Sequence, residues 1–462
     1  MRSAKIIATL GPQSQTEDQI EKLVQAGANA FRLNLSYDSP QTHAALISAV
    51  RAVEQNMGVP LCLIADLAGP RFRIGDFAET KIRLEVGQTF RLDQDDTPGD
   101  TTRVCLPVPE AYVRSSIGDL LRLDDGRVML RITAISPVAL TCIVVAGEEL
   151  AGNKIISIPT VSPRRDTLGE KDMAQIKWAQ QAGIDWLSVS WPHNAEMWRE
   201  TRANAGAMKL IAKMESRLCL ESVDVAIDLA DGLVVARGDL GYDLPPEEIP
   251  GWQKRLVRAA RQAGKPVIIA AQMLESMVSS PAPTRAEASD VANAVKDGAD
   301  ALMLSAETAV GAYAPEAVEM MASVITRVEA DQPVTSYENE GTPTIANTIA
   351  KAAAGAADAL SAPLIFCFTS SGSTALSVAR TRPNTTIVCA SDDRQTLRQM
   401  QLVWGLKCQQ APALSNWPDV EDTAVNLAKD MNISGGEPLV ITAGMPFGAS
   451  GSTNILRIAT AA

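Results

Sequence analysis

Hydrophobic residues along the chain gather in short runs that alternate with amphipathic, alanine-rich segments. The segments between the runs, such as "IEKLVQAGA" and "RLVRAARQAGK", have apolar residues at helical spacing and end at glycine. Eight strands alternating with helices favour a parallel sheet, and eight is the number that closes a (β/α)8 TIM barrel. The eight runs are "KIIATL" from position 5, "NAFRLNL" from 29, "PLCLIADL" from 60, "DWLSVS" from 185, "KLIAKM" from 209, "DGLVVARG" from 231, "PVIIAAQM" from 266 and "DALMLS" from 300.

A different pattern occupies the gap between the third and fourth runs. Residues 71–165 alternate apolar and polar positions, as in "KIRLEV", "TFRLDQ" and "LTCIVV", and Asp125-Gly126 within "DLLRLDDGRVMLRI" is a hairpin signal. This pattern predicts an inserted all-β domain. Because the insertion leaves the carboxyl end of a barrel strand, where barrel active sites lie, we expect it to act as a lid.

The barrel would then comprise residues 1–70 and 166–335. A polar stretch, "DQPVTSYENEGTP", follows and is typical of a linker. Beyond it, "APLIFCFTS", "TTIVCAS" and "EPLVITAG" again alternate with helical segments, so residues 345–462 are predicted to form a C-terminal α/β domain.

Composition narrows the function. A chain of 462 residues with 46% hydrophobic and 21% charged residues is typical of a soluble protein of several domains. Its net charge of −12 argues against nucleic acid as a partner, because sequence-independent binding needs a cationic face. No apolar run approaches the ~18 residues of a membrane span. We therefore expect no membrane association and a cytoplasmic location.

Cysteine and histidine exclude further classes. The seven cysteines are scattered singly, without the spacing of a zinc site or a disulfide framework, which fits a reducing compartment. The two histidines, His43 and His193, lie in no catalytic-looking cluster. A histidine-based catalytic triad is therefore effectively excluded.

Polar residues follow the predicted barrel strands at their carboxyl ends, where barrel enzymes place their functional side chains. Glu215 and Asp239 could together hold a hard divalent ion such as Mg²⁺. Lys213 and Arg32 would repel that ion unless an anion lay between them, a pattern that suits phosphoryl transfer. Alternatively, Lys213 and Glu215 simply pair with each other at the rim. The residues at these strand ends are Arg32, Asn34, Ser36, Asp66, Lys213, Glu215, Gly238 and Asp239.

Three other segments carry weaker signals. "ARGDLG", residues 236–241, could bring backbone NH groups close to an anion or could be a plain strand-to-helix turn. Thr284 before a predicted helix is usually only an N-cap. "TSSGSTA" after the run "PLIFCF" could be a phosphate site at a helix start or a capped helix without a ligand. This last loop comprises Thr369, Ser370, Ser371, Gly372, Ser373 and Thr374.

Taken together, the segments closely resemble the pyruvate kinase family. The motifs run in family order over essentially the whole chain, and residues 231–309 are the most specific part. The family's architecture, a barrel interrupted by a β lid and followed by an α/β regulatory domain, agrees with the segmentation above. The matching segments are "KIIATLGPQS", "AGANAFRLNLS", the Asp66 to Arg73 stretch, "NKIISIPTV", "EKD", "KME", "LVVARGDLG", "GKPVIIAAQMLESM", "PAPTRAEASDVANAVKDGADALMLSAETA", "TSSGSTA" and "GSTNILRI".

The resemblance implies transfer of a phosphoryl group from phosphoenolpyruvate to ADP, giving pyruvate and ATP. It implies that Glu215 and Asp239 carry Mg²⁺ or Mn²⁺, that Lys213 stabilises the phosphoryl group in transit, and that Arg32 binds phosphate. A homotetramer is also expected from the family. No catalytic histidine is needed, since the phosphoryl group passes directly between the two substrates.

Further roles follow from the same resemblance. Gly238, Asp239 and Thr284 match the positions that hold the substrate carboxylate, and Thr284 would belong to the path that delivers a proton to the enolate. Because a hydroxyl is too weak an acid, water must be the ultimate proton donor. Arg73 and Lys171 match nucleotide-contacting positions. The loop of residues 369–374 matches the site that the family uses for phosphorylated sugar effectors.

One stretch departs coherently from the usual family pattern. In potassium-dependent members, positions matching Asn34, Ser36, Asp66 and the main chain of Leu67 hold the monovalent cation, and a glutamate stands at position 71. Here that residue is Arg71, as in cation-independent members. The resemblance therefore implies that K⁺ is not required and that the guanidinium supplies its charge; the alternative is that Arg71 is a solvated surface charge.

Four further positions differ from the usual family residues, and none of them belongs to the set assigned to metal or phosphoryl transfer. They are Tyr37, Ala282, Ala306 and Val310. Two other functions are compatible with parts of the sequence: a non-catalytic sensor of phosphoenolpyruvate or sugar phosphates, and a barrel lyase acting on pyruvate enolates. Retention of Lys213, Glu215, Asp239 and Thr284 together argues against a sensor. A lyase would share the metal but would need neither the lid nor Lys171.

Overall fold

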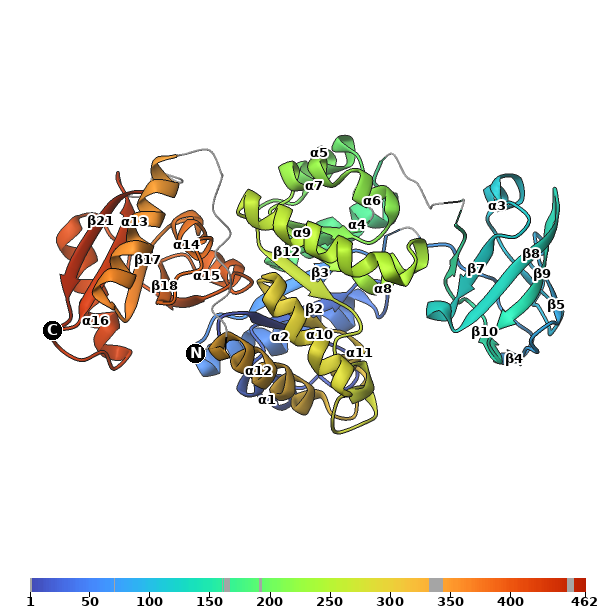
Figure 1. The fold of residues 1–462 in the computed structure, drawn as a ribbon, viewed down its shortest axis with the longest axis horizontal. Coiled ribbons are helices and arrows are strands. Elements are labelled where there is room, and N and C mark those ends of the chain that lie inside the picture. The colour runs from blue at the N-terminus through green and yellow to red at the C-terminus, as the bar shows by residue number, and fades with distance from the viewer. Residues whose placement is uncertain are drawn as a thin grey trace.

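The computed structural model describes residues 2–69, 71–159, 161, 167–190, 193–331, 344–446 and 453–462. Along the long axis of the molecule, a central barrel lies between a β-rich domain at one end and the C-terminal domain at the other (Figure 1). The expected domain boundaries near residues 70, 165 and 335–345 fall on or next to positions outside the described residues, as does nearly all of the expected linker. Those boundaries stay predictions.

In the described part of the chain, eight parallel strands close into a barrel, which confirms the predicted fold class. Around the barrel the order is β1-β16-β15-β14-β13-β12-β3-β2. All eight predicted runs are barrel strands. They are β1 (Lys5–Thr9), β2 (Ala30–Asn34), β3 (Cys62–Asp66), β12 (Trp186–Val189), β13 (Lys209–Met214), β14 (Gly232–Ala236), β15 (Val267–Ala270) and β16 (Ala301–Leu304).

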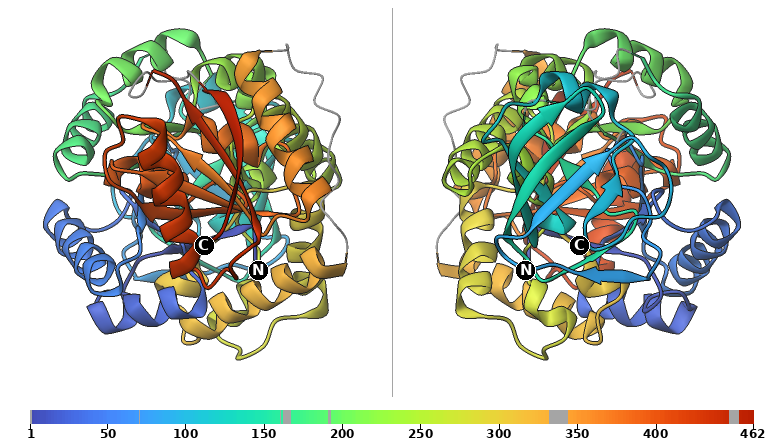
Figure 2. Two further views of the ribbon diagram at one scale, coloured as in Figure 1. Left: turned by 90° about the vertical axis from the view of Figure 1, so that its left-hand side faces the viewer. Right: turned by 90° about the vertical axis from the view of Figure 1, so that its right-hand side faces the viewer.

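Helices surround this sheet and cover its apolar outer face (Figure 2). Glycine ends several of them as predicted; Gly264, for example, has φ +71 after α9. The main helices of the barrel are α1 (Glu17–Ala26), α2 (Pro40–Met57), α4 (Glu170–Gln181), α5 (Ala195–Asn204), α7 (Val223–Leu229), α9 (Ile249–Ala263), α10 (Arg285–Asp297) and α12 (Ala314–Asp331). Short helical segments at the loops are α6 (Arg217–Glu221), α8 (Arg237–Asp243), α11 (Ala306–Ala309), η2 (Pro246–Glu248) and η3 (Glu275–Val278).

The insertion is built of β-strands, as the period-two pattern predicted, with one short helix, α3, that was not predicted. Its six-stranded sheet has the order β11-β7-β8-β9-β5-β6, and β10 pairs with β4 in a second, two-stranded sheet. The expected hairpin at Asp125-Gly126 joins β7 and β8 as an antiparallel pair. The elements are β4 (Lys81–Arg83), β5 (Thr89–Asp93), β6 (Arg103–Cys105), α3 (Pro109–Arg114), β7 (Leu120–Leu123), η1 (Asp124–Gly126), β8 (Val128–Ser136), β9 (Ala139–Ala146), β10 (Glu149–Ala151) and β11 (Ile156–Ser157).

The C-terminal domain has a five-stranded sheet in the order β19-β18-β17-β20-β21. The predicted strands correspond to β17, β18 and β20, while β19 and the antiparallel edge strand β21 were not predicted. The elements are α13 (Ile345–Leu360), β17 (Leu364–Phe368), α14 (Ser373–Ala379), β18 (Thr386–Ser391), α15 (Arg394–Met400), β19 (Leu406–Gln410), α16 (Trp417–Asp430), β20 (Pro438–Gly444) and β21 (Thr453–Thr460).

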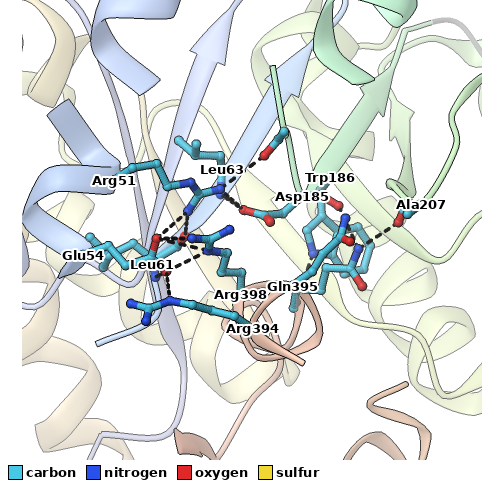
Figure 3. Close-up of polar contacts among 12 residues, drawn as sticks. Arg51, Glu54, Leu61, Leu63, Asp185, Trp186, Ala207, Arg394, Gln395 and Arg398 are labelled. Atoms are coloured by element: carbon cyan, nitrogen blue, oxygen red, sulfur yellow. Dashed lines mark hydrogen bonds and ion pairs between the residues drawn. The ribbon is translucent and has the colours of Figure 1, made fainter. Parts of the chain in front are cut away.

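The C-terminal domain covers the amino ends of the barrel strands, opposite the lid. Buried Glu54 on α2 accepts hydrogen bonds from Arg398 on α15, with a shortest distance of 2.6 Å. Arg51 joins Glu54 at 3.2 Å to buried Asp185 at 2.8 Å, so charges from both domains form one network (Figure 3). The pKa of Glu54 is lowered because Arg398 and Arg51 outweigh the opposing effect of burial.

An apolar contact closes the same end of the barrel. Leu402, from the segment after α15, is fully buried among the inward-facing barrel residues, including Ile7, Ile64 and Trp186. The indole of Trp186 also donates a hydrogen bond of 3.0 Å to the carbonyl of Gln399. The barrel interior is therefore completed by a side chain of the C-terminal domain.

Candidate active site

Charged side chains meet at the carboxyl end of the barrel, where β2 and β3 lie next to each other in register. Arg32 on β2 donates to Asp66 on β3 through Nε at 3.0 Å and also through Nη2. The other terminal nitrogen of Arg32 lies 3.4 Å from Oγ1 of Thr9. The arginine of the neighbouring strand is thus one direct partner of Asp66.

Lys213 on β13 is the second cation of the cluster. Its Nζ lies 3.3 Å from Oδ1 of Asp66 and 3.1 Å from Oε2 of Glu215, and its side chain is only 8% exposed. Glu215 follows β13 directly. The simpler sequence interpretation, that Lys213 and Glu215 pair, therefore holds, and Lys213 additionally bridges to Asp66.

Arg71 provides the third cation and contacts two carboxylates from different loops. Its Nη2 lies 3.0 Å from Oε2 of Glu215, and its Nη1 lies 2.9 Å from Oδ1 of Asp239 at the start of α8. The side chain is 17% exposed, so Arg71 is not a solvated surface charge here. Nor does it pair directly with Asp66, whose ion-pair partners among the described residues are Arg32 and Lys213.

The surroundings shift the pKa values of the three acids in the cluster in different directions. Burial raises the pKa of Glu215, and Lys213 and Arg71 offset that effect only in part. Burial also acts on Asp239 and Asp66, but neighbouring cations dominate and lower both pKa values: Arg71 and Lys213 at Asp239, and Lys213 and Arg32 at Asp66. Burial opposes the charge of Lys213, yet Asp66, Glu215 and Asp239 raise its pKa. The lysine is therefore an ammonium at neutral pH.

Three cations and three carboxylates balance in this cluster, which allows them to be buried together. One guanidinium already reaches both Glu215 and Asp239, so a single cation can contact both carboxylates. Within the described residues, no group of three or more His, Cys, Asp or Glu side chains is arranged to hold a metal ion. The two acids fit a Mg²⁺ whose other ligands are water and substrate oxygens.

The lid contacts the barrel beside this cluster. The Tyr242 carbonyl of α8 accepts hydrogen bonds from Arg122 of β7 at 3.0 Å and from Ser157 of β11 at 3.3 Å. A cavity of about 30 Å³ lies between the lid and the barrel. It is lined by lid residues 155–158 and by Arg71, Glu215 and Asp239. The lid therefore reaches the rim on which the charged residues lie.

Comparison with known proteins agrees with this geometry. The family model "Pyruvate kinase, barrel domain" matches residues 1–318, and "Pyruvate kinase, alpha/beta domain" matches residues 347–459. A pyruvate kinase of Methylorubrum extorquens is 40% identical over 99% of this chain and 97% of its own length. The chain belongs to the pyruvate kinase family.

Other relatives and a solved structure extend the match. A pyruvate kinase of Agrobacterium vitis is 39% identical over 100% of this chain and 98% of its own. A crystal structure of a pyruvate kinase from Cryptosporidium parvum superposes with a TM-score of 0.91 at 28% identity, covering 100% of this chain and 96% of that one. The chain is thus an enzyme of the pyruvate kinase family with that family's fold. Of the helices in the described residues, none has the length and apolarity to cross a membrane.

Several residues expected from the pyruvate kinase resemblance lie outside the charged cluster. Thr284 is the N-cap of α10, where its hydroxyl accepts from the Glu287 backbone at 3.2 Å and donates to the Glu287 carboxylate at 2.9 Å. Arg73 donates to the carbonyl of Asn153 at 2.7 Å, at the base of the lid. Lys171 is exposed on the first turn of α4. Gly238 lies in α8 next to Asp239, where an added Cβ would approach that of Ala271 to 3.2 Å.

The residues expected at a monovalent-cation site mainly contact one another and their neighbours. The side-chain oxygen of Asn34 accepts from the backbone of exposed Ser36 at 3.1 Å. The carbonyl of Leu67 accepts from the hydroxyl of Ser190 at 2.9 Å. Asn34 and Asp66 face each other in register at the ends of β2 and β3.

The loop of residues 369–374 lies between β17 and α14 and is rich in hydroxyl contacts. Oγ1 of Thr369 accepts from the backbone of Gly372 at 3.0 Å, and the hydroxyl of Ser371 donates to that of Ser373 at 3.3 Å. Thr374 and Thr453 share a hydrogen bond of 2.6 Å. Gly372 has φ +84, and a Cβ there would lie 2.5 Å from the sulfur of Met400.

Two residues that contact the cations of the site were missed in the sequence: Thr9 at the end of β1, beside Arg32, and Ser190, beside Lys213. Ser190, directly after β12, accepts a hydrogen bond from Lys213 at 3.4 Å and is buried. Its position at the carboxyl end of the fourth predicted strand was the available signal, because barrel enzymes place functional side chains at these ends.

Proposed function

We propose that this enzyme catalyses Mg²⁺-dependent transfer of a phosphoryl group from phosphoenolpyruvate to ADP, giving pyruvate and ATP. The observation that carries the proposal is the position of Lys213, a buried ammonium held between Asp66 and Glu215 beside Arg32. Phosphoryl transfer depends mainly on positioning and on neutralising the charge of the moving group, and this arrangement provides fixed positive charge for both.

In this mechanism Arg32 would bind the phosphate of the substrate and Lys213 would stabilise the phosphoryl group as it moves. Glu215 and Asp239 would hold Mg²⁺ or Mn²⁺, which supplies charge neutralisation at the substrate oxygens when bound. Gly238, Asp239 and Thr284 would receive the substrate carboxylate, and the Thr284 hydroxyl would belong to the path of the proton to the enolate carbon. Water supplies that proton, because a hydroxyl is too weak an acid.

The nucleotide would bind on the lid side of the cluster. Arg73 at the base of the lid and Lys171 on α4 are the cations assigned to ADP. Contacts of Arg122 and Ser157 with Tyr242 support a lid that closes on α8 and excludes water, which would otherwise accept the phosphoryl group. This assignment would fail if Arg73→Ala and Lys171→Ala left the KM for ADP unchanged.

We further propose that activity needs no K⁺. Asn34, Ser36, Asp66 and the carbonyl of Leu67 would be the remnant of a monovalent-cation site, and Arg71 would supply the charge that the ion supplies elsewhere. Two observations support this: Arg71 is held in the cluster by Glu215 and Asp239, and its pKa is raised by those two carboxylates and by Asp66, against the effect of burial. A tethered cation needs no separate binding step.

Regulation, assembly and location are proposed from the family. A phosphorylated sugar would act at the loop of residues 369–374, and the enzyme would be a homotetramer. A cytoplasmic location is supported by the seven cysteines, all of which are free and buried. Flat activity across a panel of sugar mono- and bisphosphates at subsaturating phosphoenolpyruvate would exclude the effector.

A coupled assay of pyruvate formation tests the main proposal. The purified chain is supplied with phosphoenolpyruvate and Mg²⁺, with and without ADP, and both pyruvate and ATP are measured. Equal amounts of the two products, formed only with ADP, are expected. Pyruvate without ADP would indicate a lyase or phosphatase, and no product with intact binding of phosphoenolpyruvate would indicate a sensor.

A further inference from the structure

Two consecutive residues directly after β15 have left-handed backbone conformations. Ala271 has φ +72 and Gln272 has φ +55. Among the described residues other than glycine, they are the only consecutive pair with positive φ. The left-handed region is unfavourable for residues with a Cβ, and alanine and glutamine lack the short polar side chain that lets asparagine adopt it. Such a turn persists only when its surroundings hold it in place.

The turn is held by Arg237, a buried cation that the proposed mechanism does not use. Nη2 of Arg237 donates to the carbonyl of Ala271 at 2.6 Å and to that of Gln272 at 3.3 Å. Both terminal nitrogens of Arg237 also pair with the carboxylate of Asp290 on α10, at 2.8 and 2.7 Å. The side chain is 9% exposed. A planar fork that reaches two carbonyls and a carboxylate is a use of arginine that lysine cannot reproduce.

These contacts join the elements that carry the proposed carboxylate site. Arg237 directly precedes Gly238 and Asp239 in the first turn of α8. Its partner Asp290 lies on α10, and the N-cap of α10 is Thr284. One guanidinium therefore connects the two helices whose first residues are proposed to bind the carboxylate of the substrate.

Two further contacts tie the turn to both sides of that site. On one side, a Cβ at Gly238 would lie 3.2 Å from the Cβ of Ala271, so the start of α8 packs directly against the turn. On the other side, Ser276 of η3 donates to the carboxylate of Glu287 at 2.8 Å through its backbone and at 2.5 Å through its hydroxyl. The same carboxylate accepts from the hydroxyl of Thr284 at 2.9 Å. A change in the turn would therefore displace both α8 and the start of α10.

We propose that Arg237 is a positioning residue for the carboxylate of the substrate: it holds the left-handed turn and thereby fixes Gly238, Asp239 and Thr284 relative to one another. The inference rests on the proposed assignment of those three residues to the carboxylate. Arg237 itself would not contact the substrate, because its side chain is buried and its terminal nitrogens are bonded to groups of the protein.

The nucleotide provides an internal comparison. Arg73 at the base of the lid and Lys171 on α4 are the residues proposed for ADP, and in the described part of the chain neither has an ion pair or hydrogen bond with Arg237. Loss of the Arg237 fork should therefore weaken binding of a carboxylate and leave binding of ADP intact. A variant that only lowered the stability of the fold would not separate the two ligands.

Binding of oxalate to the full chain in saturating Mg²⁺ tests the proposal without requiring turnover. Oxalate is a planar dicarboxylate of about the size of the enolate of pyruvate, and calorimetry measures its affinity beside that of ADP. Arg237→Lys keeps the charge but removes the fork. It should weaken oxalate binding by about tenfold or more, because small displacements of positioned groups have large effects. The affinity for ADP should change by less than about twofold.

A variant of the partner residue covers the case in which Arg237→Lys does not fold. Asp290→Asn removes the counter-charge of Arg237 at a position whose side chain is 34% exposed. It should weaken oxalate binding by about threefold or more, the effect of one weakened charged hydrogen bond. Unchanged oxalate affinity in Asp290→Asn would overturn the proposal.

Glycine in the turn gives a second test of the same idea. Gln272 is exposed, and glycine adopts positive φ readily, so Gln272→Gly should make the turn less dependent on Arg237. In that background Arg237→Lys should weaken oxalate binding by less than about threefold. The same loss in both backgrounds would show that Arg237 does not act through the turn and would overturn the proposal.

Arg382→Lys is the matched control. Arg382 is also a buried arginine, with a side chain 3% exposed and an ion pair to Asp300, but it belongs to the C-terminal domain. This variant should change oxalate affinity by less than about twofold.

Thr284→Val distinguishes failure of the inference from failure of the proposed function. If Thr284→Val weakens oxalate binding and Arg237→Lys does not, the carboxylate site stands and the role of Arg237 is overturned. If neither variant weakens it, the assignment of the carboxylate site fails and the inference fails with it. Equal losses of oxalate and ADP affinity in Arg237→Lys would also overturn the inference.

Discussion

The guanidinium of Arg71 donates to the carboxylate of Glu215 across 3.0 Å, although the two residues are 144 positions apart in the chain. The same guanidinium contacts Asp239. These are the two acids proposed to hold the divalent metal, and one side chain of the protein contacts both of them. Substitution of Arg71 is therefore expected to change both the dependence of activity on K⁺ and the affinity for the divalent ion.

We predict that the wild-type enzyme is active without K⁺ and that Arg71→Glu creates a potassium requirement. At ~4 Å and an effective dielectric near 20, a tethered charge contributes a few kcal/mol toward a carboxylate, comparable to a bound ion. Activity is measured in tetramethylammonium buffer with and without KCl. Stimulation of the wild type by more than about tenfold would contradict the prediction. Arg127→Glu, on an exposed lid residue, is the charge-matched control.

A second prediction concerns the divalent ion. Chelation should abolish activity and added Mg²⁺ should restore it. In Arg71→Met, no guanidinium competes for Glu215 and Asp239, so Mn²⁺ should bind the substrate-free protein about tenfold more tightly than it binds the wild type. Titration followed by electron paramagnetic resonance measures this affinity directly. Weaker Mn²⁺ binding in Arg71→Met would show that the arginine organises the two acids rather than competing for them.

The third prediction distinguishes the effect of Lys213 on kcat from that of Ser190, which accepts a hydrogen bond from it. Lys213→Met should lower kcat by about 10²–10³, with little change in the KM for ADP, because it removes charge stabilisation of the transferring group. Ser190→Ala should lower kcat only about fivefold, the effect of one hydrogen bond of about 1 kcal/mol. Ser190→Thr keeps the hydroxyl and should recover most of the loss. Equal losses in Lys213→Met and Ser190→Ala would contradict this order.

The fourth prediction concerns the buried network between the domains. Glu54→Gln leaves Arg51 and Arg398 without their shared counter-charge, so it should lower the free energy of unfolding at pH 7 by about 3–5 kcal/mol. Glu421→Gln, which removes a partner of exposed Arg457 within one domain, is the control and should cost less than about 1 kcal/mol. Urea denaturation measures both values.

The fifth prediction concerns how the contribution of Glu54 to the free energy of unfolding changes with pH. Its folded pKa is lowered by Arg398 and Arg51, so its contribution is fully present above the unfolded value of about 4.3 and is lost as pH falls through the lower folded value. The difference in stability between the wild type and Glu54→Gln should therefore shrink below about pH 4. A constant difference down to pH 3 would indicate that Glu54 acts through packing alone.

The sequence predicted the barrel well because each of its strands is buried on both faces and reads as a continuous apolar run. It missed β19, "LKCQQ", and β21, "TNILRIAT", which are edge strands of the C-terminal sheet with polar residues facing outward. Residues at strand ends were identifiable as one rim. The pairing of cations with acids could not be predicted. Arg71 lies in a loop, and its side chain contacts Glu215 and Asp239 instead of Asp66, which depends on how the loop folds over the rim.

Leu402 lies fully buried in the barrel interior, although the last barrel strand ends at Leu304. During synthesis, about a hundred residues must therefore follow that strand before the barrel core can be complete. A nascent chain that stops short of this point leaves the inward faces of Ile7, Ile64 and Trp186 without their last neighbour. The barrel of this enzyme thus reaches its final packing only once the C-terminal domain has supplied Leu402.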